Sequence, residues 1–372
     1  MGNFGCILLK IIICGCLYGG VCYYFKIFGQ LSNSIIQIFI TNINDYWYFS
    51  PNMLVVMIWI ILSPLMFKKT IHEMNITNYI GVFCAYNLII SLIVLFVYKL
   101  KYENSINLSE IEIYSTKISW IKKIVSLCGL LDTFLYQFNL FPIYVGLKNR
   151  SSNKMKKLCF LAVFSACILD IIAGVLGYIM YVKRIDNIII EIIREEFILY
   201  LRKKQYVISL FLFLLIVSFL LGGLFSIPLL FFGAKENYLN MTFLLFKKLF
   251  PKTKDEEKGK ELIDFDNKEN IKTKEENKTQ LNENKYLIFF LTLIFYLSSL
   301  IVTLYAEKLI NMLNAMGAIA SNPLICIFPP ISYILLNKNK FQIKLLIPWL
   351  MVCFGFSLII IYFYYIFNSQ NL

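Results

Sequence analysis

Residues 206–233 read YVISLFLFLLIVSFLLGGLFSIPLLFFG and contain no charged side chain. A transmembrane helix needs about 20 consecutive, mostly apolar residues, and this stretch is long enough. Apolar and polar residues do not alternate along it, as they would in a membrane β-strand. A helix bonds its backbone polar groups within its own segment, which is what lipid requires. The stretch therefore predicts a membrane-spanning α-helix.

Several other stretches share this pattern, so the sequence predicts an all-α, polytopic helical membrane bundle with about nine transmembrane helices. We expect a single transmembrane domain over residues 1–372, with spans at 7–29, 51–67, 79–98, 118–146, 156–182, 206–233, 286–305, 309–336 and 343–367. Loops after the even-numbered spans carry more Lys and Arg, which indicates the cytoplasmic side. Among them, 251–285 is rich in Lys, Glu and Asn and is predicted to be a disordered, charged cytoplasmic loop.

The overall composition supports a membrane protein. Hydrophobic residues make up 59% of the chain and charged residues only 16%, whereas a soluble domain has roughly 25% charged residues. The net charge is +13, and the basic residues lie in loops beside apolar runs. That pattern is typical of anchoring in a lipid bilayer. Nucleic-acid binding is excluded, because it would need a basic face on a soluble domain.

The residues that metal sites and common enzymes need are missing. The chain has ten cysteines and one histidine, His72. The cysteines lie in or beside apolar runs without a C-x-x-C pair, which is typical of packing residues, so we expect no metal site and no cofactor. There is also no Ser/His/Asp set, no H-E-x-x-H and no P-loop. The sequence therefore does not predict an enzyme.

Two ionisable side chains fall inside predicted spans. Asp170 lies near the middle of the fifth span, and Asp132 lies in the first half of the fourth. An ionisable residue at mid-bilayer costs at least about 2.5–3.5 kcal/mol, so it is a functional candidate. Asp170 fits an ion or proton site as well as it fits a helix-packing carboxyl. For Asp132 we favour the packing carboxyl, bonded to a neighbouring hydroxyl, because this residue lies closer to the interface.

The fourth span also holds the densest polar cluster of any apolar stretch, since residues 133–142 read TFLYQFNLFP. Pro142 removes a backbone donor and disfavours helical geometry at the residue before it. Together these features suggest a broken helix, and the alternative, a simple proline kink in a packed helix, would be favoured on this signal alone. Irregular backbone survives at membrane depth only where it lines a cavity, and transporters bind substrate at such breaks.

The chain continues this pattern, reading FLYQFNLFPIY at 134–144, LKNRS at 147–151 and then Lys154-Met155. This string resembles the sixth span of the amino acid/auxin permeases, with the basic loop that follows it. The family includes system A/N neutral amino-acid transporters and vacuolar amino-acid transporters. Weaker matches occur in the family's order: Pro64-Leu65 with Lys68-Lys69, GVLGY at 174–178, LFSI at 224–227, and Gly317-Ala318 with Pro323, Pro329 and Tyr333.

The resemblance implies the five-plus-five inverted-repeat transporter fold and secondary active transport of amino acids by alternating access, coupled to protons or sodium. It implies an amino-acid substrate and a multi-pass protein of the plasma membrane or of a vacuolar or other organelle membrane. The residues we expect to line the substrate are Tyr136, Gln137, Phe138 and Asn139, and the ion-coupling candidates are Asp170 and Ser218. Gln137 and Asn139 would supply hydrogen bonds to the substrate.

The chain departs from the family in one respect that affects function. The family's broken sixth span follows only three predicted spans here instead of five, so the first two spans are expected to be missing. In this fold the first span forms half of the substrate and ion site. One alternative is therefore a transporter-derived amino-acid sensor or scaffold without transport activity, and another is a fragment of a longer transporter gene.

Overall fold

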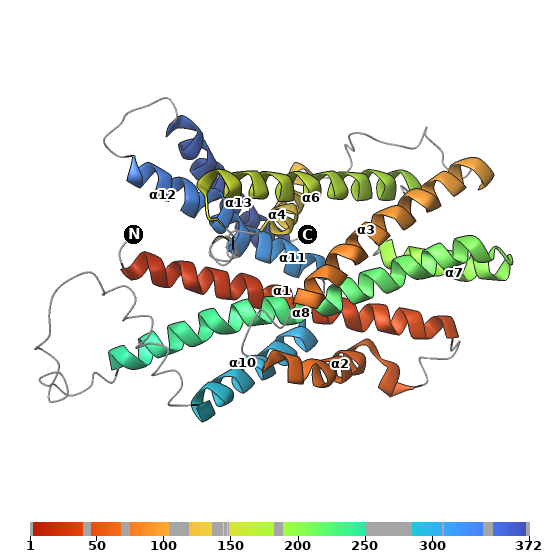
Figure 1. Cartoon of the computed structure of the whole chain (residues 1–372), viewed down its shortest axis with the longest axis horizontal. Coiled ribbons are helices and arrows are strands. Elements are labelled where there is room, and N and C mark those ends of the chain that lie inside the picture. Colours follow the sequence, from red (N-terminus) through yellow and green to blue (C-terminus); the bar gives the residue numbers. More distant parts are fainter. Residues whose placement is uncertain are drawn as a thin grey trace, which may run out of the picture.

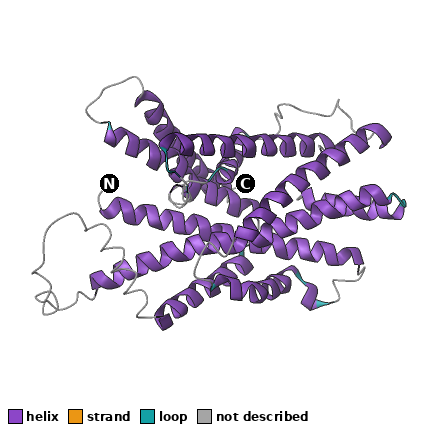
Figure 2. Cartoon of the chain, in the orientation of Figure 1, coloured by secondary structure: helices purple, strands orange, loops and turns teal. Residues whose placement is uncertain are grey.

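A computed structural model describes residues 3–39, 46–67, 75–103, 119–135, 144, 147, 149–181, 189–249, 285–306, 309–337 and 345–369. Within these ranges all regular elements are helical, and Figure 2 shows them in purple. The predicted all-α, polytopic membrane fold is confirmed. Apart from Lys285, the predicted loop 251–285 lies outside the described residues.

The helices carry the labels of Figure 1, and short 3-10 or π-helical segments carry the letter η. In chain order they are α1 (Asn3–Phe39), η2 (Trp47–Phe49), α2 (Pro51–Met66), α3 (Asn75–Tyr98), η4 (Lys99–Glu103), α4 (Trp120–Thr133), α6 (Ser152–Tyr181), α7 (Ile189–Arg202), α8 (Tyr206–Leu249), α10 (Lys285–Tyr305), α11 (Leu309–Met316), η8 (Gly317–Ser321), η9 (Pro323–Ile327), α12 (Phe328–Leu336) and α13 (Leu346–Ser369).

Seven segments of the described residues are long and apolar enough to cross a membrane. They are Ile7–Gln37, Tyr79–Tyr102, Ser152–Tyr181, Tyr206–Leu244, Tyr286–Tyr305, Asn311–Leu336 and Leu346–Asn368. The predicted span 51–67 corresponds to the shorter apolar helix Pro51–Met66. The predicted span 118–146 is described as a helix over Trp120–Thr133. The count of nine spans therefore stays a prediction.

Local sequence explains where α2 begins and how far α8 extends. The Ser50 hydroxyl accepts a bond from the Met53 amide, and Pro51 occupies the first turn, where its missing donor is not needed. The helix α8 continues past the predicted end at residue 233. Beyond it, the buried Lys235 amine donates to the Met66 carbonyl at the end of α2, at 3.1 Å, where a positive charge complements the helix dipole.

The long helix α8 forms the centre of the bundle, packed along α1 and α3 (Figure 1). One apolar cluster unites α1, α2, α8 and α10 through buried residues such as Phe25, Phe231 and Tyr296. The Tyr296 ring stacks on Trp59 of α2 at 4.2 Å. The Tyr296 hydroxyl donates to the Trp59 carbonyl at 2.6 Å, and the indole donates to the Tyr296 carbonyl at 3.2 Å. These contacts hold α10 against α2.

A second group contains α4, α11, η8, η9, α12 and α13, with α12 and α13 at the upper left of Figure 1 and α4 and α11 nearer its centre. Its cluster of Val125, Cys128, Ala318, Leu358 and Tyr362 is separate from the first one. The two groups meet along α1, where Cys16 packs on residues of η8 and η9. These two packed units therefore share α1, and a third buried cluster, which includes Leu95, Phe197 and Leu212, unites α3, α7 and α8.

The helix α6 differs from the others because none of its most apolar window is buried inside the structure. Phe160 and Phe164, for example, are 66% and 54% exposed. An apolar helix with such a surface is suited to contact with lipid.

Candidate functional site

The predicted substrate residues follow directly after α4. This helix ends at Thr133, and Phe134 forms its cap, donating to the Leu131 and Asp132 carbonyls. Tyr136, Gln137, Phe138 and Asn139 lie outside the described residues. The candidate site is therefore built from the side chains that surround the last turn of α4.

Asp132, on that last turn, accepts hydrogen bonds from two other elements. Its Oδ1 atom accepts from the Ser321 hydroxyl of η8 and from the Cys16 thiol of α1, the latter at 3.6 Å. Cys16 and Ser321 also contact each other, with Sγ and Oγ 3.3 Å apart. Both are enclosed, at 2% and 0% exposure, while Asp132 is only partly buried. The carboxyl thus joins α4, α1 and η8 through two neutral donors.

Direct backbone contact between α4 and η8 places these groups together. A Cβ atom built on Gly317 would lie 1.8 Å from the Cys128 carbonyl oxygen, so glycine is the residue that permits this approach. Ser321 lies at the other end of the same π-helical segment. Such segments often occur at functional sites, because they shift side chains relative to a regular α-helix.

Asn322 is a second fully enclosed polar residue beside Ser321. Its amide donates to the Gly355 carbonyl of α13 at 2.8 Å. Its Oδ1 atom is buried and has no hydrogen-bond partner. Nearly all buried acceptors are satisfied in folded proteins. The Asn322 Oδ1 atom can therefore still accept a hydrogen bond from a further donor.

The ion-coupling candidate Ser218 is buried in α8 at the contact with α3. The Asn87 amide of α3 donates to its hydroxyl oxygen and, at 3.5 Å, to the Leu214 carbonyl. The Ser218 oxygen is therefore already bonded to a neighbouring helix. Its role in ion coupling stays a prediction.

The other ion-coupling candidate, Asp170, is exposed on α6. Thr133, at the end of α4, lies near its carboxyl, and the Thr133 hydroxyl donates to the Leu130 carbonyl of its own helix at 2.8 Å. Asp170 and Ser218 thus have separate neighbours on separate helices. Asp170, on α6, thus lies near the same end of α4 that carries Asp132.

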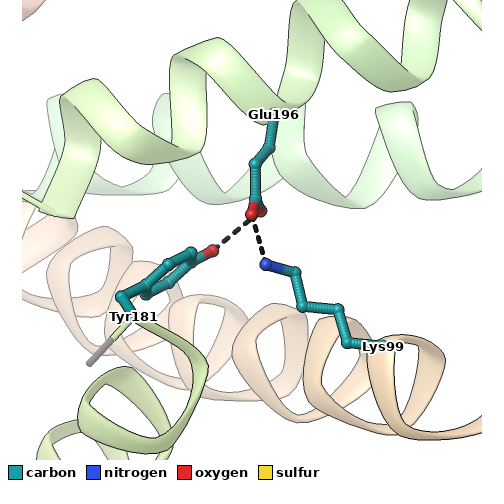
Figure 3. A network of polar contacts seen from close by, with 3 residues as sticks. All are labelled: Lys99, Tyr181 and Glu196. Atoms are coloured by element: carbon teal, nitrogen blue, oxygen red, sulfur yellow. Dashed lines mark hydrogen bonds and ion pairs between the residues drawn. The ribbon is translucent and has the colours of Figure 1, made fainter. Parts of the chain in front are cut away.

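A further buried carboxyl belongs to Glu196, in α7. Figure 3 shows it between Lys99 of η4 and Tyr181 at the end of α6. Glu196 forms an ion pair with Lys99, accepts from the Tyr181 hydroxyl at 2.8 Å, and the lysine Nζ lies 4.4 Å from the centre of the Tyr181 ring. The Lys99 and Glu196 side chains are 7% and 14% exposed. This network ties three elements together around a compensated charge.

Sequence reasoning identified Asp132 but missed its partners. Ser321 and Asn322 are adjacent polar residues in an apolar span, directly after the small residues Gly317, Ala318 and Ala320. That combination could have marked a close helix contact with polar bonds across it. Cys16 was interpreted only as a packing residue. Within the described ranges, no three His, Cys, Asp or Glu side chains group as metal ligands would.

Comparison with known proteins adds a finding of a different kind. A family model described as "Transmembrane amino acid transporter protein" matches residues 1–368 of the chain. No curated protein and no solved structure gives a significant match.

Proposed function

The chain belongs to the transmembrane amino acid transporter family, and from this premise we propose that it is a secondary active transporter coupled to protons or sodium. As a member of that family it is a multi-pass integral membrane protein of amino-acid transport and not an enzyme. The observation that carries the proposal is the family match over nearly the whole chain. The substrate would bind at the predicted break around residues 136–142, and this site would open to each side of the membrane in turn.

Alternating access requires two units that can move relative to each other around the substrate. The separate clusters of α1, α2, α8 and α10 and of α4, η8 and α13 support this part of the proposal. The end of α4 lies where the two units meet, at the contact between Cys16 and Asp132. A substrate bound after Thr133 would therefore act on the boundary between the units.

Substitutions of Gln137 and Asn139 test the proposal. An amino acid loses water from its charged amine and carboxylate when it binds, and directed hydrogen bonds can replace that water. Losing one bond to a charged group costs about 1.5–3 kcal/mol, or roughly 10- to 150-fold in affinity. We expect Gln137→Ala and Asn139→Ala to weaken amino-acid binding by that factor. Phe160→Ala, on the exposed face of α6, is the control and should bind normally.

The measurement is amino-acid binding by ligand-induced thermal shift, together with uptake into proteoliposomes. If both substitutions leave affinity within about twofold of the wild type, the segment after α4 is not the substrate site. Binding without uptake would instead favour the amino-acid sensor.

A further inference from the structure

The Asp132 carboxyl is bonded entirely by neutral groups. Ser321 and Cys16 donate to Oδ1, and in the described part of the chain no lysine or arginine pairs with this residue. A carboxylate without a cation is costly in a medium of low dielectric constant, so the neutral acid is favoured there. The two donors favour the ionised form instead. Burial and the two donors of Asp132 therefore act on its protonation in opposite directions.

The Asp132 carboxyl is less enclosed than the two side chains that bond to it. The Cys16 and Ser321 side chains are buried, whereas Asp132 keeps part of its surface exposed. Both described hydrogen bonds end on Oδ1, so a proton added to Oδ2 would break neither of them.

From this geometry we infer that Asp132 is the binding site of the coupling proton, held between α1, α4 and η8 and four residues before the first predicted substrate residue, Tyr136. The inference rests on the proposed function, because it names the coupling ion of that transporter. The proton adds to Oδ2 from water on one side of the membrane and leaves from the same atom to water on the other side. Oδ1 accepts from Ser321 and Cys16 in both states.

A sodium ion fits this arrangement less well. Hard cations such as sodium select oxygen ligands, and a thiol is a soft one. The described partners of Asp132 are one hydroxyl oxygen and the Cys16 sulfur. The unpaired Asn322 oxygen belongs to a side chain bonded toward α13.

Apart from Asp170, the titratable groups described near Asp132 ordinarily change charge at higher pH than a carboxyl. From α1, Tyr23 and Tyr24 lie close enough to interact with its charge, and Cys16 donates to it. Phenols and thiols ordinarily ionise above neutral pH. From α6, Asp170 reaches the adjacent Thr133, and it is the group that must be tested separately.

The test uses the full chain in proteoliposomes, with the internal and external pH set independently and without sodium. We expect the wild type to concentrate an amino acid in response to a pH gradient. Asp132→Asn keeps an acceptor oxygen for Ser321 and Cys16 but cannot release a proton. It should lose gradient-driven uptake by at least tenfold, while exchange of labelled for unlabelled amino acid stays within about threefold of the wild type. Asp170→Asn tests the competing ion-coupling candidate, and it should keep the response to the gradient if Asp132 holds the proton.

Ser321→Ala provides a second measurement if Asp132→Asn does not fold. Removing one donor disfavours the ionised carboxyl, so the midpoint of the pH–uptake profile should move to higher pH by about 0.5–1 unit. A merely structural contact would lower uptake at every pH without moving that midpoint.

Three outcomes would overturn this inference but leave the proposed function standing. Gradient-driven uptake could persist in Asp132→Asn, or the wild type could exchange amino acids while a pH gradient drives no net uptake. The third is an unchanged midpoint of the pH–uptake profile in Ser321→Ala. Wild-type protein that neither binds nor exchanges amino acids would instead overturn the proposed function, and this inference with it.

Discussion

Glu196 and Asp132 are both carboxyls at helix contacts, yet their partners have opposite character. Glu196 is paired with the Lys99 amine and the Tyr181 hydroxyl (Figure 3). Asp132 is bonded to the Ser321 hydroxyl and the Cys16 thiol. A fixed cation compensates the charge of a carboxylate, whereas neutral donors stabilise that charge without compensating it.

This difference separates a structural role from a functional one. The Glu196 network links η4, α6 and α7, and the Lys99 amine compensates the charge of Glu196. The Asp132 contact lies where the two helical units meet. We therefore expect substitutions at Glu196 to change stability and substitutions at Asp132 to change coupling.

The largest effect is expected for Lys99→Met, which turns Glu196 into an uncompensated buried carboxyl. Removing one partner of a buried ion pair typically destabilises a protein by about 3–5 kcal/mol. The double variant Lys99→Met/Glu196→Gln leaves no unpaired charge and should recover most of that loss. Denaturant unfolding in detergent, followed by tryptophan fluorescence, measures both. A loss below 1 kcal/mol in the single variant would show that Glu196 needs no cation.

A smaller effect is expected for Gly317→Ala, which separates η8 from α4. The added methyl group would overlap the Cys128 carbonyl oxygen at 1.8 Å, and such overpacking costs about 1–3 kcal/mol. The helix shift would also pull Ser321 away from Asp132. Gly174→Ala is the matched control, because a Cβ there meets no atom within 4 Å. Thermal unfolding measures the stability of both variants. Equal stability of Gly317→Ala and Gly174→Ala would refute the close contact.

Ser218→Ala tests a polar contact that contains no carboxyl. It removes the hydroxyl that accepts from Asn87, and a neutral hydrogen bond contributes about 0.5–1.5 kcal/mol. If Ser218 only joins α3 to α8, stability should fall by that amount and the sodium dependence of uptake should not change. A raised sodium requirement would show that Ser218 is an ion ligand.

The smallest change in stability is expected for Asp132→Asn. The amide oxygen can still accept from Ser321 and Cys16, and no buried cation is left unpaired, so the free energy of unfolding should stay within about 1 kcal/mol of the wild type. Denaturant unfolding checks this at a pH where the carboxyl is neutral. A loss as large as that of Lys99→Met would mean that Asp132 has a charged partner after all.

Much of the fold could be predicted from the sequence, because lipid leaves a chain few alternatives. Long apolar runs must become helices that satisfy their own backbone, and the structure forms helices at 206–233 and at the other described runs. The helix α7 lies between the predicted spans 156–182 and 206–233, where no helix was predicted. Its buried residues Ile193, Phe197 and Tyr200 repeat at helical spacing. Charged residues between them hid that pattern.

The candidate site was less predictable, because its parts are distant in the chain. Asp132 stood out as an ionisable residue in an apolar span, and the predicted bond to a hydroxyl is present. Its partners Cys16 and Ser321 are 116 and 189 residues away. No local pattern connects residues at such separations, and only the crossing of α4 with α1 and η8 brings them together.

Proton linkage of amino-acid binding tests the central claim most directly. Titration calorimetry in buffers of different ionisation enthalpy counts the protons taken up or released when the substrate binds to the purified protein. We expect up to about one proton per amino acid for the wild type and for the charge-balanced variant Lys99→Met/Glu196→Gln, and none for Asp132→Asn. Proton linkage that survives in Asp132→Asn, or that disappears in Lys99→Met/Glu196→Gln, would contradict the account.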